Sequence, residues 1–285
     1  MHLERLTGVI GAQVTDIDLR NLSQSQAETL RIAICDYSVL VIPDQYLSPT
    51  EQATFSHLLG PYSPVPFVQP IHEHPEVIRV VKEASDKEEF NFGGVWHSDF
   101  SFLPTPPAFT ILQAVEVPKV GGDTVWSSMT AAHDALQDDM RSQLEKITAL
   151  HSASDAYSPN QQARHSQLSG MDIRTSNSAK KRTRHPLLCT HPENGRRNLF
   201  FNRLYVRGLE GPELSGPRKS KRERQLLDWL HEWTTQIRFT VRHRWSNGDI
   251  CIWDNRSTQH LAINDYPGQR RELTRTTVAG SPPSS

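Results

Sequence analysis

The sequence contains two potential metal ligands, His97 and Asp99, which are separated by a single residue. In an extended backbone this spacing directs both side chains to the same face of the chain, so one metal ion could contact both. An imidazole and a carboxylate suit a divalent cation of intermediate hardness, and a third ligand would complete the facial set of non-haem Fe(II) oxygenases. Taken alone the pattern is common, and a surface histidine beside an aspartate is the simpler interpretation.

A third ligand has to come from another part of the chain. Near the C-terminus an apolar run passes into a polar segment that ends at His260, and Arg271 and Arg275 follow it. If the segment that carries the two arginines is extended, their spacing places both on one face, with the metal. The C-terminal quarter of the chain therefore offers one further ligand and two cations.

The elements around these residues are expected to be many short strands. Short β-like runs at 77–81, 109–112 and 124–126 are separated by glycine and proline, and alternating apolar residues at 237–245 indicate a half-buried strand. This pattern differs from the regular alternation of strands and helices in parallel α/β proteins. It favours a β-sandwich or jelly roll.

Two helices are expected near the N-terminus. Ser25 and Glu28 have the spacing of a capping box, and Ser48 and Glu51 repeat that spacing with a proline between them. The apolar run 38–43 lies between the two expected helices and is predicted to form a buried strand. Helices should therefore flank the β core.

Composition narrows the class of protein. The 285 residues carry a net charge of −1, which gives no global field toward nucleic acid or an anionic membrane. Cys35, Cys189 and Cys251 are odd in number and widely spaced, which argues against a disulfide framework and a thiolate zinc site. No apolar run approaches the ~18 residues of a membrane span, and no targeting segment stands out. We therefore expect a cytoplasmic protein without nucleic-acid or membrane partners.

The chain is expected to form a single domain over residues 1–285, because it contains no internal repeat and no linker. Residues 158–184 are rich in polar and charged side chains and poor in large apolar ones. Such a segment is predicted to be a mobile insertion or lid at the surface.

Several separate segments resemble the taurine dioxygenase and 2,4-dichlorophenoxyacetate dioxygenase (TauD/TfdA) family of Fe(II)/2-oxoglutarate-dependent enzymes. The resemblance spans nearly the whole chain, and it implies a double-stranded β-helix, which is a cupin-like jelly roll, with flanking helices. The segments that carry it are LTGVIGA (6–12), WHSDFSF (96–102), VGGDT (120–124), LFFN (199–202), WDNRSTQH (253–260) and RRELTR (270–275).

The resemblance implies roles for particular residues. It assigns the Fe(II) ligands to His97, Asp99 and His260, and the 2-oxoglutarate site to Thr124 and Arg271, with O2 as the second cosubstrate. The chemistry agrees, because a guanidinium forms two parallel hydrogen bonds with a carboxylate such as the distal one of 2-oxoglutarate.

The resemblance also points to residues around the primary substrate. It makes Arg275 the anchor for an acidic group, Tyr205 an aromatic wall and Trp253 an indole beside the cosubstrate; a surface ion pair and ordinary core packing are the alternatives. The taurine enzymes carry an asparagine where Gly93 stands, four residues ahead of the first ligand. They also place a histidine against the sulfonate in a segment that here, at 60–66, contains none. Both departures argue against taurine and suggest a roomier or less polar pocket.

The expected reaction is hydroxylation of a C–H bond in a small acidic substrate, with release of succinate and CO2. Sulfonates, sulfate esters and aryloxy acids are the substrates that the resemblance suggests, and an amino acid or natural-product hydroxylase or desaturase is the alternative. A zinc hydrolase would use the same three ligands but leaves Thr124 and Arg271 unexplained. A non-catalytic jelly-roll binding protein is a further alternative. Relatives of this kind commonly form dimers or tetramers, so a homo-oligomer is expected.

Overall fold

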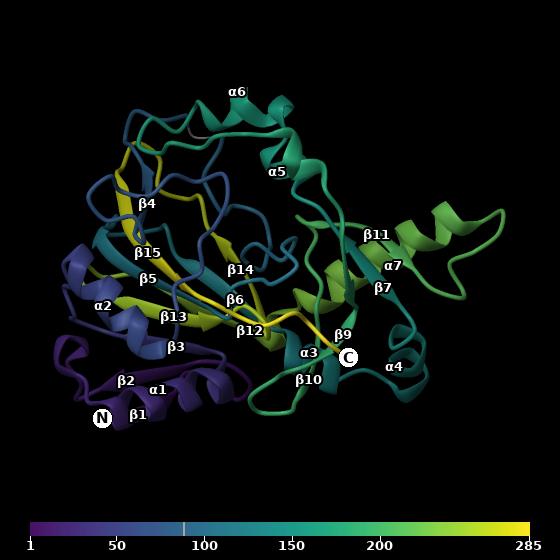
Figure 1. Ribbon diagram of the computed structural model, residues 1–285, viewed down its shortest axis with the longest axis horizontal. Coiled ribbons are helices and arrows are strands. Elements are labelled where there is room, and N and C mark those ends of the chain that lie inside the picture. Colours follow the sequence, from purple (N-terminus) through teal and green to yellow (C-terminus); the bar gives the residue numbers. More distant parts are fainter. Residues whose placement is uncertain (88) are drawn as a thin grey trace.

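The computed structural model of the chain describes residues 1–87 and 89–285, and its largest element is a seven-stranded sheet (Figure 1). Neighbouring strands are antiparallel except for β2 and β3, which run parallel. Strands from both ends of the chain interleave in this sheet. Its order is β1 (His2–Arg5), β2 (Ala12–Thr15), β3 (Val39–Ile42), β13 (Ile250–Asp254), β5 (Phe109–Glu116), β15 (Arg271–Val278) and β4 (Ile78–Lys82).

Three smaller sheets complete the β structure in the described part of the chain. The sheet that carries site residues has the order β12 (Thr240–His243), β6 (Thr124–Ser128) and β14 (Thr258–Ala262). The other two are β11 (Val206–Glu210), β7 (Thr148–His151) and β8 (Thr183–Pro186), and the pair β10 (Arg197–Leu199) and β9 (Leu188–Thr190).

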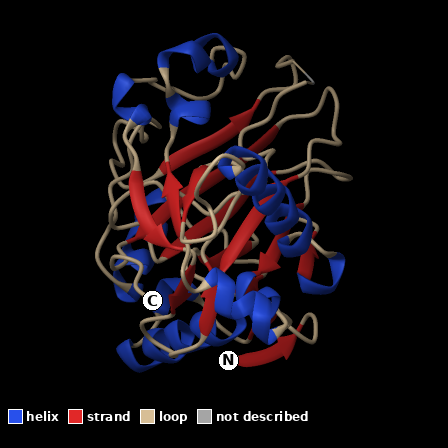
Figure 2. Ribbon diagram, turned by 90° about the vertical axis from the view of Figure 1, so that its right-hand side faces the viewer, coloured by secondary structure: helices blue, strands red, loops and turns tan. Residues whose placement is uncertain are grey.

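Helices surround the strands, as the view in Figure 2 shows. In the described residues no helix is both long and apolar enough to cross a membrane. The α-helices are α1 (Gln24–Tyr37), α2 (Pro49–Leu59), α3 (Met129–Asp134), α4 (Asp138–Leu144), α5 (Ser154–Tyr157), α6 (Gln162–His165) and α7 (Lys219–Thr234), and the 3-10 turns are η1 (Leu19–Asn21), η2 (Pro159–Gln161), η3 (Asn177–Lys180) and η4 (Ile237–Phe239).

The central strands of the large sheet are buried on both faces. Along β13, Ile250 and Ile252 belong to the core under α1 and α2, whereas Cys251 and Trp253 belong to a second core that also contains Trp126 from β6. This alternation follows from the two-residue period of a strand. An apolar layer thus joins the large sheet to the small one, and the predicted class, a mainly β jelly roll with flanking helices, is confirmed.

The two N-terminal helices differ in how well their starts were predicted. Helix α2 begins as expected, because Ser48 accepts a hydrogen bond from the backbone of Glu51 and donates its own N–H to that carboxylate. Helix α1 is capped by Ser23 with Gln26, two residues before the predicted cap at Ser25. Glutamine serves in a capping box as well as glutamate does, so both spacings were possible in the sequence.

Residues 158–184 fold over one side of the β core and carry α6 near the top of Figure 1. Leu168, Ile173 and Ala179 are buried from within this segment and share an apolar cluster with Tyr205. The segment therefore forms part of the wall around Tyr205.

Candidate active site

The backbone places the two histidines side by side. His97 and His260 form an isolated antiparallel bridge, in which the N–H of each donates to the carbonyl of the other at 3.0 and 2.7 Å. Their ring centroids lie 4.1 Å apart. Because His260 belongs to β14, this bridge fixes the segment that contains His97 to the edge of the small sheet.

Asp99 lies beside the two histidines and offers a third potential metal ligand. The segment after His97 turns rather than continuing as a strand, with a positive φ of 50° at Phe100, so the expected extended geometry holds only at the first ligand. The turn still directs Asp99 inward, and Asp99 Oδ1 lies 3.6 Å from Nε2 of His97. One potential ligand atom from each of the three residues lies within 4.8 Å of the others.

The protonation states suit a divalent cation. His97 Nδ1 donates to the carbonyl of Val95 at 2.7 Å, which leaves the Nε2 lone pair available. Burial and the neighbouring His97 lower the pKa of His260 to about 3. Burial acts to raise the pKa of Asp99, but the neighbouring His97 and His260 and the charge of Arg275 outweigh it and hold this pKa well below its usual range. Two imidazoles with free lone pairs and a carboxylate fit Fe(II).

Two polar residues hold Asp99 in position. Thr110 donates to Asp99 Oδ2 at 2.7 Å, and the Thr110 hydroxyl in turn accepts from Asn255 Nδ2 at 2.9 Å. The amide oxygen of Asn255 accepts from the backbone N–H of Asp99 and from the indole of Trp253. Sequence reasoning missed both roles, although Asn255 lies within the matching segment 253–260.

We expect Thr110→Val, which keeps the shape but removes the hydroxyl, to weaken Fe(II) affinity by roughly 10- to 100-fold, because supporting hydrogen bonds orient metal ligands. Anaerobic metal titration measures this. Thr274→Val is the matched control: Thr274 is also buried, but its hydroxyl donates to Gln52 on the opposite face of β15. Equal affinity in the Thr110 variant and the unmodified protein would contradict the assignment.

The first of the two arginines lies against the small sheet. Arg271 is 5% exposed; its Nε donates to the carbonyl of Gly122 at 3.0 Å, and its Nη2 lies 3.4 Å from the hydroxyl of Thr124. Trp245 also donates to that hydroxyl, at 2.9 Å. Burial lowers the pKa of Arg271, so a carboxylate partner would stabilise its charge. Trp245 is a further residue that the sequence did not single out.

Arg275 lies on the same face of β15, because the strand is extended between the two arginines. It is 4% exposed, and its Nη1 lies 3.6 Å from Asp99 Oδ1. Its Nε and Nη2 are buried and have no hydrogen-bond partner among the described residues. Unpaired buried donors on a cation are costly, so this guanidinium is suited to receive an anion.

The remaining predicted residues also surround the three ligands. Gly93 lines the same cavity, and Trp253 lines it with its ring 4.7 Å from that of His260. Tyr205 lines an adjoining cavity and meets the His97 ring edge-on at 6.3 Å. The structure thus brings together all nine residues singled out in the sequence.

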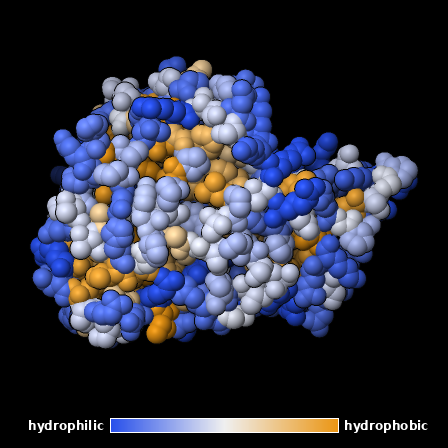
Figure 3. Space-filling view, viewed as in Figure 1, coloured by the Kyte–Doolittle hydropathy of each residue, from blue (hydrophilic) through white to orange (hydrophobic). Residues whose placement is uncertain are grey.

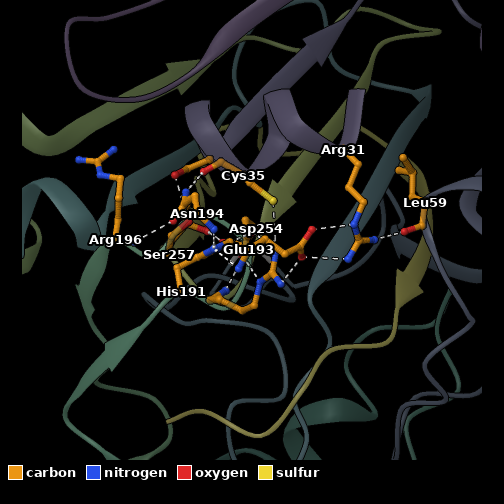
Figure 4. Close-up of polar contacts among 12 residues, drawn as sticks. Arg31, Cys35, Leu59, His191, Glu193, Asn194, Arg196, Asp254 and Ser257 are labelled. Atoms are coloured by element: carbon orange, nitrogen blue, oxygen red, sulfur yellow. Dashed lines mark hydrogen bonds and ion pairs between the residues drawn. The ribbon is translucent and has the colours of Figure 1, made fainter. Parts of the chain in front are cut away.

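Cys35, His191 and Asp254 form a second cluster of potential ligands (Figure 4). His191 Nε2 donates to Asp254 at 2.9 Å, and its Nδ1 accepts two backbone N–H groups, so neither nitrogen is free. Asp254 is also paired with Arg256, and burial raises the pKa of Cys35 to about 12. This cluster is a buried ion-pair network, and it holds the residue next to Asn255.

Comparison with known proteins gives this geometry its context. Residues 2–277 match the model of the family described as taurine catabolism dioxygenase TauD, TfdA family. The chain belongs to this family. It is 34% identical to an alkylsulfatase from Acinetobacter baylyi, over 98% of this chain and 85% of the relative, and 30% identical to an α-ketoglutarate-dependent sulfate ester dioxygenase from Pseudomonas putida, over 99% and 91%.

Solved structures agree with this TauD/TfdA membership. A taurine dioxygenase from Burkholderia xenovorans superposes with a TM-score of 0.81 at 28% identity, covering 100% of this chain and 92% of that one. AAD-2, solved in complex with Mn(II) and N-oxalylglycine, gives 0.78 at 28% identity, covering 100% and 99%. The predicted family, fold and reaction class of an α-ketoglutarate-dependent dioxygenase, with O2 as the other cosubstrate, are confirmed.

Proposed function

We propose that this enzyme binds Fe(II) through His97, Asp99 and His260 and hydroxylates a C–H bond of a small organic acid. The observation that carries the proposal is the convergence of these three ligands in a cavity that also contains Arg271 and Arg275. When bound, the iron supplies the activation of O2 that the reaction requires. The protein binds and orients both organic acids around it.

In this proposal Arg271 binds the distal carboxylate of 2-oxoglutarate. Its guanidinium is already held by Gly122 and Thr124, so little side-chain entropy is lost when the cosubstrate binds. Thr124 contributes a neutral hydroxyl, and the ring of Trp253 packs beside the metal-side cavity. Oxidative decarboxylation of the cosubstrate gives succinate and CO2.

Arg275 binds the acidic group of the primary substrate, with Tyr205 as one wall of its pocket. The two relatives named as sulfate-ester enzymes favour an alkyl sulfate as the first substrate to test. One oxygen atom of O2 would enter the C–H bond next to the ester oxygen, and the hydroxylated ester would collapse to an aldehyde and inorganic sulfate. The other oxygen atom would enter succinate.

The direct test is succinate release from 2-oxoglutarate with alkyl sulfates, alkylsulfonates, aryloxyalkanoates and amino acids. We expect release that requires Fe(II), O2 and an organic acid, with an aldehyde formed from the sulfate esters. Sulfate release without O2, or with zinc in place of iron, would instead indicate a hydrolase and overturn the proposal.

Replacement of Arg275, the proposed substrate anchor, should weaken binding of the primary substrate but not of 2-oxoglutarate. We expect Arg275→Gln to lower kcat/KM for the primary substrate by about a hundredfold, because it removes a desolvated charge pair. The KM for 2-oxoglutarate should change far less. Arg79→Gln, which removes an exposed arginine paired with Glu272, is the control and should leave both parameters near their original values. An equal loss for both acids would contradict the role of Arg275.

Several broader features belong to the same proposal. We take residues 1–285 as one catalytic domain, which is supported by the family match over 2–277 and by the interleaving of both chain ends in one sheet. Residues 158–184 would act as the lid, since they cover the side of the site near Tyr205. A homodimer or tetramer in the cytoplasm completes the proposal.

A further inference from the structure

A second cavity adjoins the metal-side cavity and is walled mainly by aromatic side chains. We call it the annex and define it by Phe90, Phe92, Tyr157, Leu204 and Tyr205. It lies under the segment that carries α5 and α6, where apolar residues gather on the molecular surface below these helices (Figure 3). The annex is therefore an apolar space that opens near the proposed lid.

Besides its apolar and aromatic side chains, the annex is lined by the buried polar residues Asn91 and His165. Asn91 donates to the carbonyl of Ala262 and His165 Nε2 donates to that of Ala156, which leaves His165 Nδ1 as a single unpaired acceptor among the described residues. Tyr157 and Tyr205 are each 3% exposed. Burial raises the pKa of Tyr157 to about 12, so it stays uncharged at neutral pH. The charged residues are at the rim, where exposed Arg164 lies 4.2 Å over the ring of Phe90 and Asp155 is paired with Arg207. Such a space favours a hydrocarbon body over a second ionic group.

Gly93 lies at the boundary between the two cavities. Gly93, Phe92 and His97 line both of them. A Cβ atom at position 93 would lie 3.5 Å from Cε1 of His97 and 3.6 Å from Cβ of Ala262, so a side chain there would fill the space between these two residues. Its φ of +79° also favours glycine. Phe92 lies close to the proposed substrate anchor, because its ring centroid is 5.8 Å from the guanidinium carbon of Arg275.

We propose that the substrate is an acid with an extended apolar body, whose anionic group binds Arg275 and whose hydrocarbon passes Gly93 into the annex. This inference rests on the proposed function, because it uses the same metal and the same anchor. It makes Gly93 and Leu204 the residues that set the length of substrate the enzyme takes.

The first test needs no variant. Unbranched alkyl sulfates from two to twelve carbons are compared by kcat/KM for succinate release with the Fe(II)-loaded protein. We expect kcat/KM to rise about three- to fourfold for each added methylene, as burial of a methylene in an apolar site predicts, until the annex is filled. A profile that is flat or falls with chain length would overturn the inference.

The second test fills the annex. We expect Leu204→Trp to lower the ratio of kcat/KM for octyl sulfate over ethyl sulfate at least tenfold and to shift the plateau to shorter chains. Leu204→Met conserves volume and should keep the ratio. Ile237→Trp, at a position 89% exposed and outside the annex, controls for the added indole and should leave the whole profile unchanged. An unchanged ratio in a folded Leu204→Trp protein would contradict the inference.

The possible outcomes distinguish a failure of the proposed function from a failure of the annex proposal alone. Failure of Fe(II) and 2-oxoglutarate to bind together would sink the proposed function and the inference with it. Joint binding with turnover of aryloxyalkanoates, sulfonates or amino acids but no dependence on the length of an alkyl sulfate would leave the function standing and remove only the annex.

Discussion

Replacing one of the three proposed metal ligands is expected to have the largest effect of any single substitution. His260→Ala should lower 2-oxoglutarate-dependent turnover at least about a thousandfold, because loss of the ion removes several kcal/mol of stabilisation from the reaction. The strand that carries His260 should remain, since β14 is paired along its length with β6. The effect should therefore appear as lost metal binding in a folded protein, measured by anaerobic Fe(II) titration together with circular dichroism.

The matched control is His72→Ala. His72 is an exposed histidine outside the cluster of ligands, so its removal should leave Fe(II) affinity and turnover unchanged. Turnover in the His260→Ala protein within tenfold of the original would mean that another residue completes the metal site. Loss of the circular dichroism signal would instead show a folding defect, and His97→Ala would then take its place.

The second largest effect is expected at Arg271, the residue that we propose binds 2-oxoglutarate. Arg271→Gln should raise the KM for 2-oxoglutarate about a hundredfold or more, because the distal carboxylate would then be buried without its charged partner. Initial rates at saturating primary substrate measure this change. Arg271→Lys should recover only part of the loss, since an ammonium cannot form the two parallel hydrogen bonds of a guanidinium.

The neighbouring residue provides the control for this change. Arg270 immediately precedes β15 and is paired with Glu83, Glu116 and Glu272 near the surface. Surface ion pairs contribute roughly 0–1 kcal/mol each, so Arg270→Gln should leave the KM for 2-oxoglutarate within about threefold. Similar losses in the Arg270 and Arg271 variants would contradict the assignment of the cosubstrate carboxylate to Arg271.

Much of the site was predictable because it depends on spacing within strands. The period of two places Arg271 and Arg275 on one face of β15 once that segment is extended. The resemblance then paired His97 with a distant His260, and the backbone bridge between them is the structural reason that this pairing brings two ligands together. Neither histidine alone carried that information.

Other features depended on contacts between distant elements and left no local signal. Thr110 is an ordinary strand residue in the sequence, and only the approach of β5 to the turn after His97 brings its hydroxyl to Asp99. Tyr157 immediately precedes residues 158–184, a polar segment that was expected to lie at the surface. Apolar residues of that segment nevertheless pack in one cluster with Tyr157, which is buried. The strand expected at 237–245 begins with the turn η4 and is shorter, as β12.

The central claim is that His97, Asp99 and His260 bind one ferrous ion that 2-oxoglutarate chelates. Anaerobic addition of Fe(II) and then 2-oxoglutarate, followed by visible absorption, tests this most directly. We predict that a charge-transfer band appears at one equivalent of iron in the unmodified protein and is absent in His260→Ala. No band in the unmodified protein, or an equal band in both, would contradict the account.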